Sequence, residues 1–253
     1  MQRSNTYIIL FSIVLTVVLG GLLSLASVGL KPAQDKQVEL DTKKKILGAV
    51  MDISSIKEPN ELLALYDQKV QSLVVNYNGD VVTQDAKGNP VVAEKVSIQK
   101  NYRFAAEDRL YPVFKFMNDK DPSKVEAYIF PMFGSGLWDW ISGYLAVGSD
   151  LNTIRGVAFD HKQETPGLGA RITSDVVQKR FEGKEIYNDN DELVSVKMVK
   201  GEGNPNLTAH EVDGMSGATL TGKGVNEMMV NYLTCYQGYI KKVKANGSSV
   251  AVN

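Results

Sequence analysis

The sequence begins with a long apolar segment, and this feature constrains the rest of the chain most strongly. No charged residue occurs among the 24 positions from Tyr7 to Leu30, which are mostly Ile, Leu and Val. As a helix these positions would reach roughly 36 Å, enough to cross a hydrocarbon core of about 30 Å. Tyr7 suits one interface of a lipid bilayer, and Lys31-Pro32 is expected to end the segment at the other. The sequence therefore predicts a transmembrane anchor over residues 1–30.

A cleaved signal peptide is the alternative, because Leu25-Ala26-Ser27 resembles a small-residue cleavage site. Signal peptides have an apolar region of only about 7–15 residues, so the length favours a retained anchor. Charge does not determine the orientation of this anchor. Arg3 precedes the segment and several lysines of residues 31–45 follow it, so Lys and Arg alone would place the following domain inside the cell.

Composition excludes several classes of protein. The chain has 28 basic and 29 acidic side chains, whereas a nucleic-acid-binding protein usually has a basic excess. Its single cysteine, Cys235, rules out an intrachain disulfide and a cluster held by several thiolates. With only His161 and His210, a histidine-based metal centre is not expected. We therefore predict no metal site, and we expect Cys235 to be a packed thiol in a helix.

The segments after the anchor alternate between helical and extended patterns. Helices are predicted over residues 38–56, 61–71, 174–181 and 221–243. Strands are predicted over residues 73–75, 81–82, 91–92, 125–130, 143–147, 154–159 and 193–199. This pattern indicates an α+β fold with a mainly antiparallel sheet and flanking helices. Residues 31–129 would form juxtamembrane helices and the first part of the soluble domain, and residues 130–253 its functional region.

Small and hydroxyl-bearing residues gather directly before the last predicted helix, in Asp213-Gly214-Met215-Ser216-Gly217-Ala218-Thr219-Leu220-Thr221-Gly222. The start of a helix has unpaired backbone N–H groups and a positive dipole end, so a phosphate would be stabilised there. The alternative is that one of the hydroxyl side chains only caps the helix. The segment is not a Walker loop, because Lys223 does not complete a GxxxxGK pattern.

Two further segments combine glycines with charged or aromatic side chains. Gln163-Glu164-Thr165-Pro166-Gly167-Leu168-Gly169-Ala170-Arg171 contains a tight Pro-Gly turn between Glu164 and Arg171, which are either functional or an ordinary surface pair. Residues 134–144 contain the only two tryptophans, Trp138 and Trp140, beside several glycines. A planar ligand could stack on a tryptophan there, and packing in the core is the alternative. No nucleophile–base pair or paired carboxylates stand out, so we predict no catalytic side chain and expect a bound cofactor to supply any redox chemistry.

The order of these three segments resembles the FMN-binding domain family of respiratory complexes. Gly-Leu-Trp, Glu-Thr-Pro-Gly-Leu-Gly and Asp-Gly-Met-Ser-Gly-Ala-Thr follow one another between about residues 130 and 240. With one N-terminal membrane helix, the chain is most similar to the C subunits of sodium-translocating NADH:quinone reductases. The chain length and single predicted membrane helix extend this resemblance beyond the motifs.

The resemblance implies that FMN is joined by a phosphodiester to Thr219, installed by a separate flavin transferase. Thr221 is the alternative acceptor. Asp213, Ser216, Gly217 and Ala218 match the rest of this flavinylation signal. The remaining residues implied to lie near the isoalloxazine ring are Glu164, Thr165, Gly167, Leu168 and Gly169, with Leu137 and Trp138 bordering the pocket.

The function implied is that of an electron-transfer subunit in a multi-subunit translocase, which oxidises NADH with ubiquinone and exports sodium. An iron–sulfur centre elsewhere in the complex would be the electron donor, and another flavin would be the acceptor. The family also implies the bacterial inner membrane, with the soluble domain on the periplasmic side, opposite to the lysine count. One alternative is the corresponding flavoprotein subunit of an ion-translocating ferredoxin:NAD oxidoreductase. Another is a membrane-anchored binding or assembly module without flavin. Residues 78–101 match no motif, and their role stays open.

Overall fold

The N-terminal helix α1 extends further than predicted. The computed structural model describes residues 4–250, with side chains up to residue 246, and the chain divides into two compact units, Met1–Thr42 and Lys43–Asn253. Helix α1 spans Asn5–Gly48, with Pro32 in its interior. The prediction of a separate helix over residues 38–56 is therefore wrong. Residues 38–48 continue α1, because an interior proline removes one helical hydrogen bond without necessarily ending the helix, and residues 49–56 are not helical. In the described part of the chain, α1 is the one helix long and apolar enough to cross a membrane, with a mean hydropathy of 2.7 over its most apolar window. It fits a membrane anchor.

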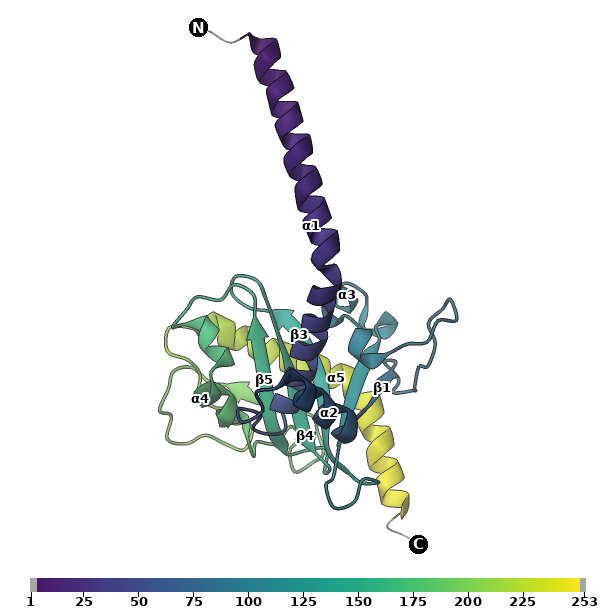
Figure 1. Ribbon diagram of the computed structural model, residues 1–253. Coiled ribbons are helices and arrows are strands. Elements are labelled where there is room, and N and C mark those ends of the chain that lie inside the picture. Colours follow the sequence, from purple (N-terminus) through teal and green to yellow (C-terminus); the bar gives the residue numbers. More distant parts are fainter. Residues whose placement is uncertain (1–3, 251–253) are drawn as a thin grey trace. The chain divides into compact units, whose positions relative to one another are not determined.

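The second unit is built on a five-stranded sheet (Figure 1). The strands are β1 (Val70–Val75), β2 (Tyr111–Met117), β3 (Val125–Ser135), β4 (Trp140–Gly148) and β5 (Ile154–His161). They follow one another in space as in the sequence, and each pairs antiparallel with the next. The predicted α+β class with an antiparallel sheet is confirmed.

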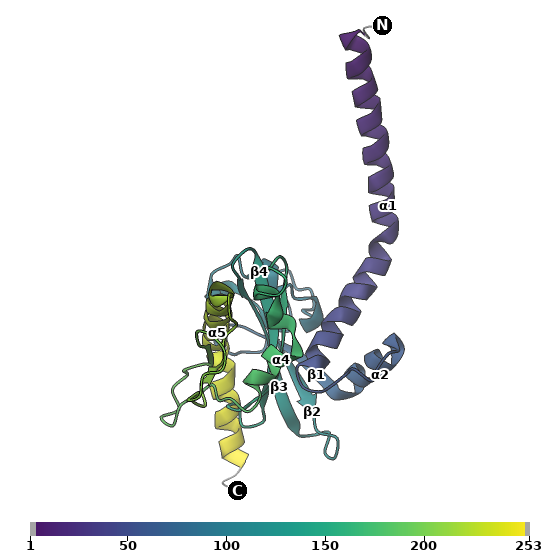
Figure 2. The ribbon, with the colours of Figure 1, turned by 90° about the vertical axis from the view of Figure 1, so that its left-hand side faces the viewer.

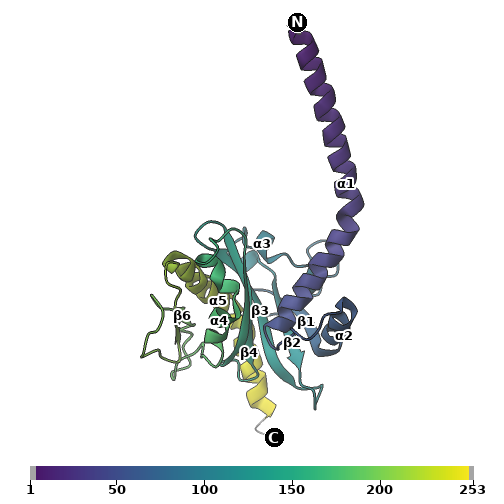
Figure 3. The same ribbon diagram turned by 60° about the vertical axis from the view of Figure 1, so that its left-hand side comes forward.

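Helices lie on both faces of this sheet, as Figures 2 and 3 show. Helix α5 (Thr219–Val250) covers one face, where the Tyr236 hydroxyl donates to the carbonyls of Pro112 in β2 and Pro131 in β3, at 2.8 and 3.2 Å. Helix α2 (Pro59–Lys69) and the last turns of α1 lie on the other face. There Gly156 leaves room for the Ala49 carbonyl, which would lie 2.6 Å from a Cβ at this position.

Short elements connect these layers. They are η1 (Ala93–Lys95), α3 (Ile98–Asn101), η2 (Ala106–Asp108), η3 (Gly169–Thr173), α4 (Asp175–Gln178), η4 (Lys179–Phe181), β6 (Lys197–Met198) and β7 (Glu211–Val212). Strands β6 and β7 form a separate parallel pair. The predicted helix over 174–181 is therefore two short pieces, and only residues 197–198 of the strand predicted over 193–199 are extended and paired.

The remaining strand predictions are confirmed in part. Residues 73–75, 125–130, 143–147 and 154–159 all lie within strands of the sheet, whereas residues 81–82 and 91–92 do not form strands. Strand β2 was not predicted. All but one of its residues are buried, so it shows no polar–apolar alternation, and Pro112 lies near its start.

Residues 78–101, to which the sequence analysis assigned no role, begin with a turn that packs on α5. Gly79 has a φ of +78°, and a Cβ there would lie 2.3 Å from the backbone nitrogen of Tyr239. Only glycine fits this contact without strain. Asp80, next in the turn, pairs with Lys242 of the same helix. This end of the segment therefore holds the C-terminal half of α5 against the sheet.

Candidate functional site

The three segments singled out in the sequence meet at the side chain of Glu164. This carboxylate is only 4% exposed. One oxygen, Oε1, accepts hydrogen bonds from the backbone N–H groups of Leu137 and Trp138 at 2.8 and 3.0 Å. The other, Oε2, accepts from the Thr221 hydroxyl at 2.5 Å. Glu164 therefore connects the loop after β5 to the tip of the β3–β4 hairpin and to the first turn of α5.

Two glycines make room for this carboxylate. A Cβ on Gly136 would lie 2.5 Å from Glu164 Oε1, and a Cβ on Gly169 would lie 2.3 Å from Glu164 Oε2. Real Cβ atoms do not approach oxygen so closely, so a side chain at either position would push the carboxylate away from its donors. The glycines of two predicted segments thus serve the same contact.

Apolar side chains surround this junction on the outside. Leu137, Trp138 and Leu168 are 44%, 67% and 42% exposed. The indole N–H of Trp138 donates to the Thr165 hydroxyl at 3.2 Å, which ties the hairpin tip to the loop. Leu168 also meets the turn before α5, since a Cβ on Gly217 would lie 2.8 Å from its Cδ2 atom. Exposed apolar groups of this kind mark binding surfaces for ligands or partners.

Thr219 and Thr221 differ sharply in their surroundings. Thr219 is the first residue of α5 and is exposed, and in the described part of the chain neither its hydroxyl nor that of Ser216 makes a hydrogen bond. Thr221 is only 1% exposed and its hydroxyl is held by Glu164. The turn before the helix is closed by a bond from the Ala218 N–H to the Met215 carbonyl at 3.0 Å. Thr219 and Ser216 are therefore the exposed hydroxyl residues of this segment, whereas Thr221 is enclosed.

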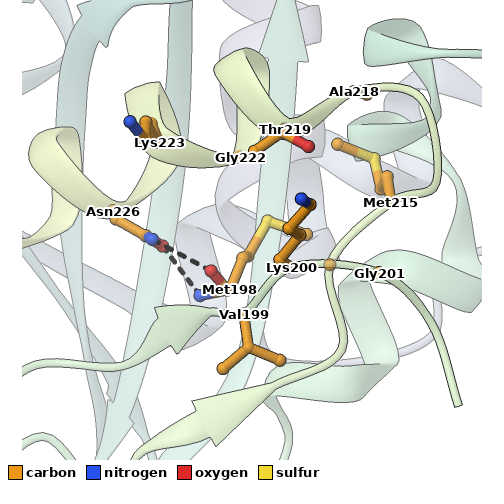
Figure 4. Close-up of a pocket in the computed structure, with 11 residues that line it drawn as sticks. Met198, Val199, Lys200, Gly201, Met215, Ala218, Thr219, Gly222, Lys223 and Asn226 are labelled. Carbon is orange, nitrogen blue, oxygen red and sulfur yellow. Dashed lines mark hydrogen bonds between the residues drawn. The ribbon is translucent and has the colours of Figure 1, made fainter. Parts of the chain in front are cut away.

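A pocket of about 520 Å³ lies beside Thr219 (Figure 4). Its volume is within the usual range for small-molecule sites. One wall is the start of α5, with Ala218, Thr219 and Lys223, and the other is the β6 region, with Met198 and Lys200. The Asn226 amide holds these walls together, accepting from the Met198 N–H at 2.7 Å and donating to its carbonyl at 3.1 Å.

Of the residues predicted to contact the cofactor, only Ala218 and Thr219 line this pocket. Leu137, Glu164 and Leu168 do not line it and belong to the junction described above. Lys200, Lys223 and Asn226 were missed by sequence reasoning. Lys200 lies in a loop without a motif, and a lysine and an asparagine within a helix carry no signal of their own.

Asp213 stabilises a loop beside the turn of residues 215–218 that precedes α5. Its carboxylate accepts from the backbone N–H groups of Gly203 and Asn204 at 3.0 and 2.9 Å, and from the Asn204 side chain at 2.6 Å. These hydrogen bonds, those from Asn204 most strongly, lower the pKa of the Asp213 carboxyl. Asp213 therefore stays ionised and holds the 203–204 turn in place.

An ion-pair cluster was also missed. Glu202 accepts from Arg171 at 2.6 Å and from Arg180 at 2.9 Å, and these two hydrogen bonds lower its pKa to about 2. Arg171 therefore pairs with Glu202, and the surface pair with Glu164 considered from the sequence is not formed. Arg180 had no motif to indicate it.

In the described part of the chain no group of His, Cys, Asp and Glu could hold a metal ion, and Cys235 is a buried free thiol.

Comparison with known proteins assigns this arrangement to a family. The model of the FMN-binding domain matches residues 136–234, a range that contains the Gly-Leu-Trp, Glu-Thr-Pro-Gly-Leu-Gly and Asp-Gly-Met-Ser-Gly-Ala-Thr motifs. The C subunit of the Na(+)-translocating NADH-quinone reductase of Pseudomonas aeruginosa is 33% identical over 245 residues, covering 90% of this chain and 91% of the relative. The chain belongs to the family of the C subunits of Na(+)-translocating NADH-quinone reductases. The family member of Haemophilus ducreyi, 32% identical over 254 residues, covers 96% of this chain and 95% of the relative.

Solved structures of the same family share the fold. The crystal structure of the family member from Parabacteroides distasonis has a TM-score of 0.68 and 33% identity, covering 83% of this chain and 96% of that one. That of Shewanella oneidensis NqrC has a TM-score of 0.69 and 26% identity, covering 83% and 99%. The family predicted from the sequence is confirmed, and it favours the quinone reductase over the ferredoxin:NAD oxidoreductase. The chain is thus one subunit of a larger membrane complex.

Proposed function

We propose that this chain carries FMN, joined through a phosphodiester to Thr219, and passes electrons within a Na(+)-translocating NADH:ubiquinone reductase. The complex would oxidise NADH and export sodium. In this role the chain receives electrons from an iron–sulfur centre of another subunit and delivers them to another flavin. A flavin transferase would attach the FMN during maturation. The isoalloxazine ring would supply the redox chemistry, and the protein its position and electrostatics.

The observation that carries this proposal is the contrast between the two threonines at the start of α5. Thr219 is exposed and its hydroxyl makes no hydrogen bond to any residue that the structure describes, whereas Thr221 is buried and bonded to Glu164. A phosphate on Thr219 would lie at the positive end of the α5 dipole. An attachment point there keeps the cofactor outside the core while the helix behind it is packed on the sheet.

The surroundings of Thr219 fit both parts of FMN. Lys200 and Lys223 line the pocket and supply positive charge for a phosphate, and Figure 4 shows Lys200 extending from the opposite wall toward the start of α5. For an aromatic ring, the junction offers the exposed side chains of Leu137, Trp138 and Leu168. Ser216, Gly217 and Ala218 shape the turn, with Gly217 at a φ of +79°. Thr165, Gly167 and Gly169 shape the loop that faces it.

In this proposal Glu164 acts from behind the cofactor surface, because both of its oxygens are already bonded to protein groups. Asp213 likewise acts on the acceptor turn of residues 215–218 through its neighbours.

We propose further that α1 anchors the chain in the bacterial inner membrane, with the unit that begins at Lys43 on the periplasmic side. Labelling an introduced cysteine in that unit with a membrane-impermeant reagent in whole cells tests the side.

Mass spectrometry of the full chain, purified from its native membrane in detergent, tests the attachment. Formation of the phosphodiester adds FMN and removes one water, so the intact mass should rise by FMN minus water. Peptide mapping should place this mass on the peptide with Thr219. Thr219→Ala should abolish covalent flavin fluorescence in a denaturing gel. Thr234→Ala, which removes an exposed threonine of the same helix, is the matched control and should keep it.

Two results would contradict the proposal. An unmodified chain from cells that contain an active flavin transferase would favour a binding or assembly module, in which the hydroxyl residues only begin a helix. Flavin retained by Thr219→Ala and mapped to Thr221 would move the attachment site.

A further inference from the structure

Arg180 lies beside the turn that leads to Thr219, although no sequence motif indicates it. We propose that Arg180 is a positioning residue for covalent flavin attachment. It holds the backbone carbonyls of Asp213 and Gly214, and this sets the turn that presents the Thr219 hydroxyl. The inference rests on the proposed function, because it concerns the reaction that would load Thr219.

The guanidinium of Arg180 is placed by its own contacts. Its Nη1 atom donates to the Asp213 carbonyl at 3.1 Å and also to the Gly214 carbonyl, and its Nη2 atom pairs with Glu202 at 2.9 Å. The next residue, Phe181, is fully buried and packs edge-on against Phe159 with ring centroids 5.3 Å apart. Because the adjacent residue is fixed in the core, the planar donor group has a defined position from which to bind two successive carbonyls.

Gly214 is confined from the opposite direction. A Cβ on Gly214 would lie 2.0 Å from the Val199 carbonyl, so the backbone here is pressed directly against the chain after β6. With Arg180 bound to its carbonyl as well, Gly214 has little freedom to shift. The acceptor turn of residues 215–218 starts at this fixed point, and Thr219 follows it. The downstream end is fixed independently, because Thr221 is bonded to Glu164.

The attachment chemistry makes such placement matter. The Thr219 oxygen would attack the FMN phosphorus of a flavin adenine dinucleotide held by the transferase. The new O–P bond forms, the phosphoanhydride bond breaks, AMP leaves, and the hydroxyl proton passes to a base of the transferase. No group is oxidised or reduced. A displacement of about 1 Å in a reacting group can cost about a hundredfold in rate.

The test compares two arginines that bind the same glutamate. Arg171 also pairs with Glu202 but donates to neither Asp213 nor Gly214. The full-length chain in detergent, as wild type, Arg180→Gln or Arg171→Gln, is incubated with purified flavin transferase and FAD. We measure initial rates of flavin attachment against acceptor concentration by in-gel fluorescence and intact mass. Thermal unfolding of each variant shows that the compared samples are folded.

For Arg180→Gln we expect kcat of attachment to fall by about tenfold to a hundredfold with little change in KM. Arg171→Gln should stay within about twofold of wild type. Arg180→Lys, which keeps the charge without the paired donors, should also be slow and serves if the glutamine variant does not fold.

Three outcomes overturn this role. They are a wild-type rate in Arg180→Gln, a wild-type rate in Arg180→Lys, and equal slowing in Arg180→Gln and Arg171→Gln. A wild-type chain that acquires no FMN at Thr219 would instead refute the proposed function, and the role of Arg180 with it. The wild-type sample therefore separates the two failures.

Discussion

Replacing Glu164 by alanine should loosen the junction at which the three functional segments meet. The change removes the acceptor of two backbone N–H groups and of the Thr221 hydroxyl, at 2.8, 3.0 and 2.5 Å. Hydrogen bonds to a charged group contribute about 1.5–3 kcal/mol each. Their sum is an overestimate, because releasing a buried carboxylate also recovers its desolvation cost. We expect a loss of about 3 kcal/mol in the free energy of unfolding, or about 6–12 °C in Tm.

Glutamine at the same position keeps the size and the hydrogen-bonding geometry of the side chain but removes its charge. Its amide oxygen can still accept from the N–H groups of Leu137 and Trp138, and the Thr221 hydroxyl can turn to accept from the amide nitrogen. We expect Glu164→Gln to cost about 1 kcal/mol, mainly from the lost charge. Gln163→Ala changes an exposed neighbour and should stay within about 0.5 kcal/mol of wild type.

Urea unfolding of the full-length chain in detergent measures these differences. Trp138 and Trp140 are the only tryptophans, and Trp138 donates its backbone N–H to Glu164, so tryptophan fluorescence reports on the hairpin tip. A shift of the urea midpoint at constant slope would give the change in stability. The reasoning is refuted if Glu164→Ala lies within about 0.5 kcal/mol of wild type. It is also refuted if the alanine and glutamine variants lose the same stability.

Three other changes test neighbouring contacts. Thr221→Val should lower the unfolding free energy by about 1–3 kcal/mol while flavin stays on the chain by mass spectrometry; loss of flavin with intact folding would contradict this. Because the pKa of Glu202 is lowered to about 2, its ion pairs stabilise the fold above about pH 4.5 and are lost as the pH falls toward 2. Glu202→Gln should lack this loss in pH-dependent unfolding, and unchanged acid sensitivity would refute the assignment. Gly169→Ala should destabilise by about 2–4 kcal/mol, whereas the helical control Gly222→Ala, with ordinary contact at 3.8 Å, should be neutral or slightly stabilising; equal Tm values would refute the steric argument.

Elements with a strong local signal could be predicted from the sequence. The apolar run of α1, the apolar strands β3 to β5 and the amphipathic α5 each have their signal within one segment. Strand β2 was missed because Pro112, its second residue, interrupts the extended pattern at its start, whereas in β3 Pro131 follows the six residues predicted as a strand. The continuation of α1 past Pro32 was missed for a related reason. The rule that proline ends a helix describes local preference, and the sequence around it supports the helix on both sides.

For the candidate site, the segments were found but not the contacts that join them. Glu164 lies 26 and 27 residues from its amide donors and 57 residues from Thr221. None of these spacings produces a periodic pattern in the sequence, so only the fold brings these groups together. The same holds for Arg180, which is 33 and 34 residues from the carbonyls it binds. Gly136 and Gly169 lie in two of these segments, but a glycine does not by itself indicate which group approaches it.

The contacts at the two ends of residues 215–218 explain how an exposed threonine would be a defined attachment point for the proposed FMN. Upstream, Arg180 binds the Asp213 and Gly214 carbonyls; downstream, Glu164 binds Thr221. Thr219 lies between these restraints with its own hydroxyl uncommitted. A single residue that is accessible to an external enzyme therefore need not be mobile. Both restraints are hydrogen bonds between protein groups, and neither involves the proposed cofactor. The turn would therefore keep the same shape before and after FMN is attached. In the proposed reaction, loading would then add a redox group without refolding the turn, so little conformational ordering would have to accompany attachment.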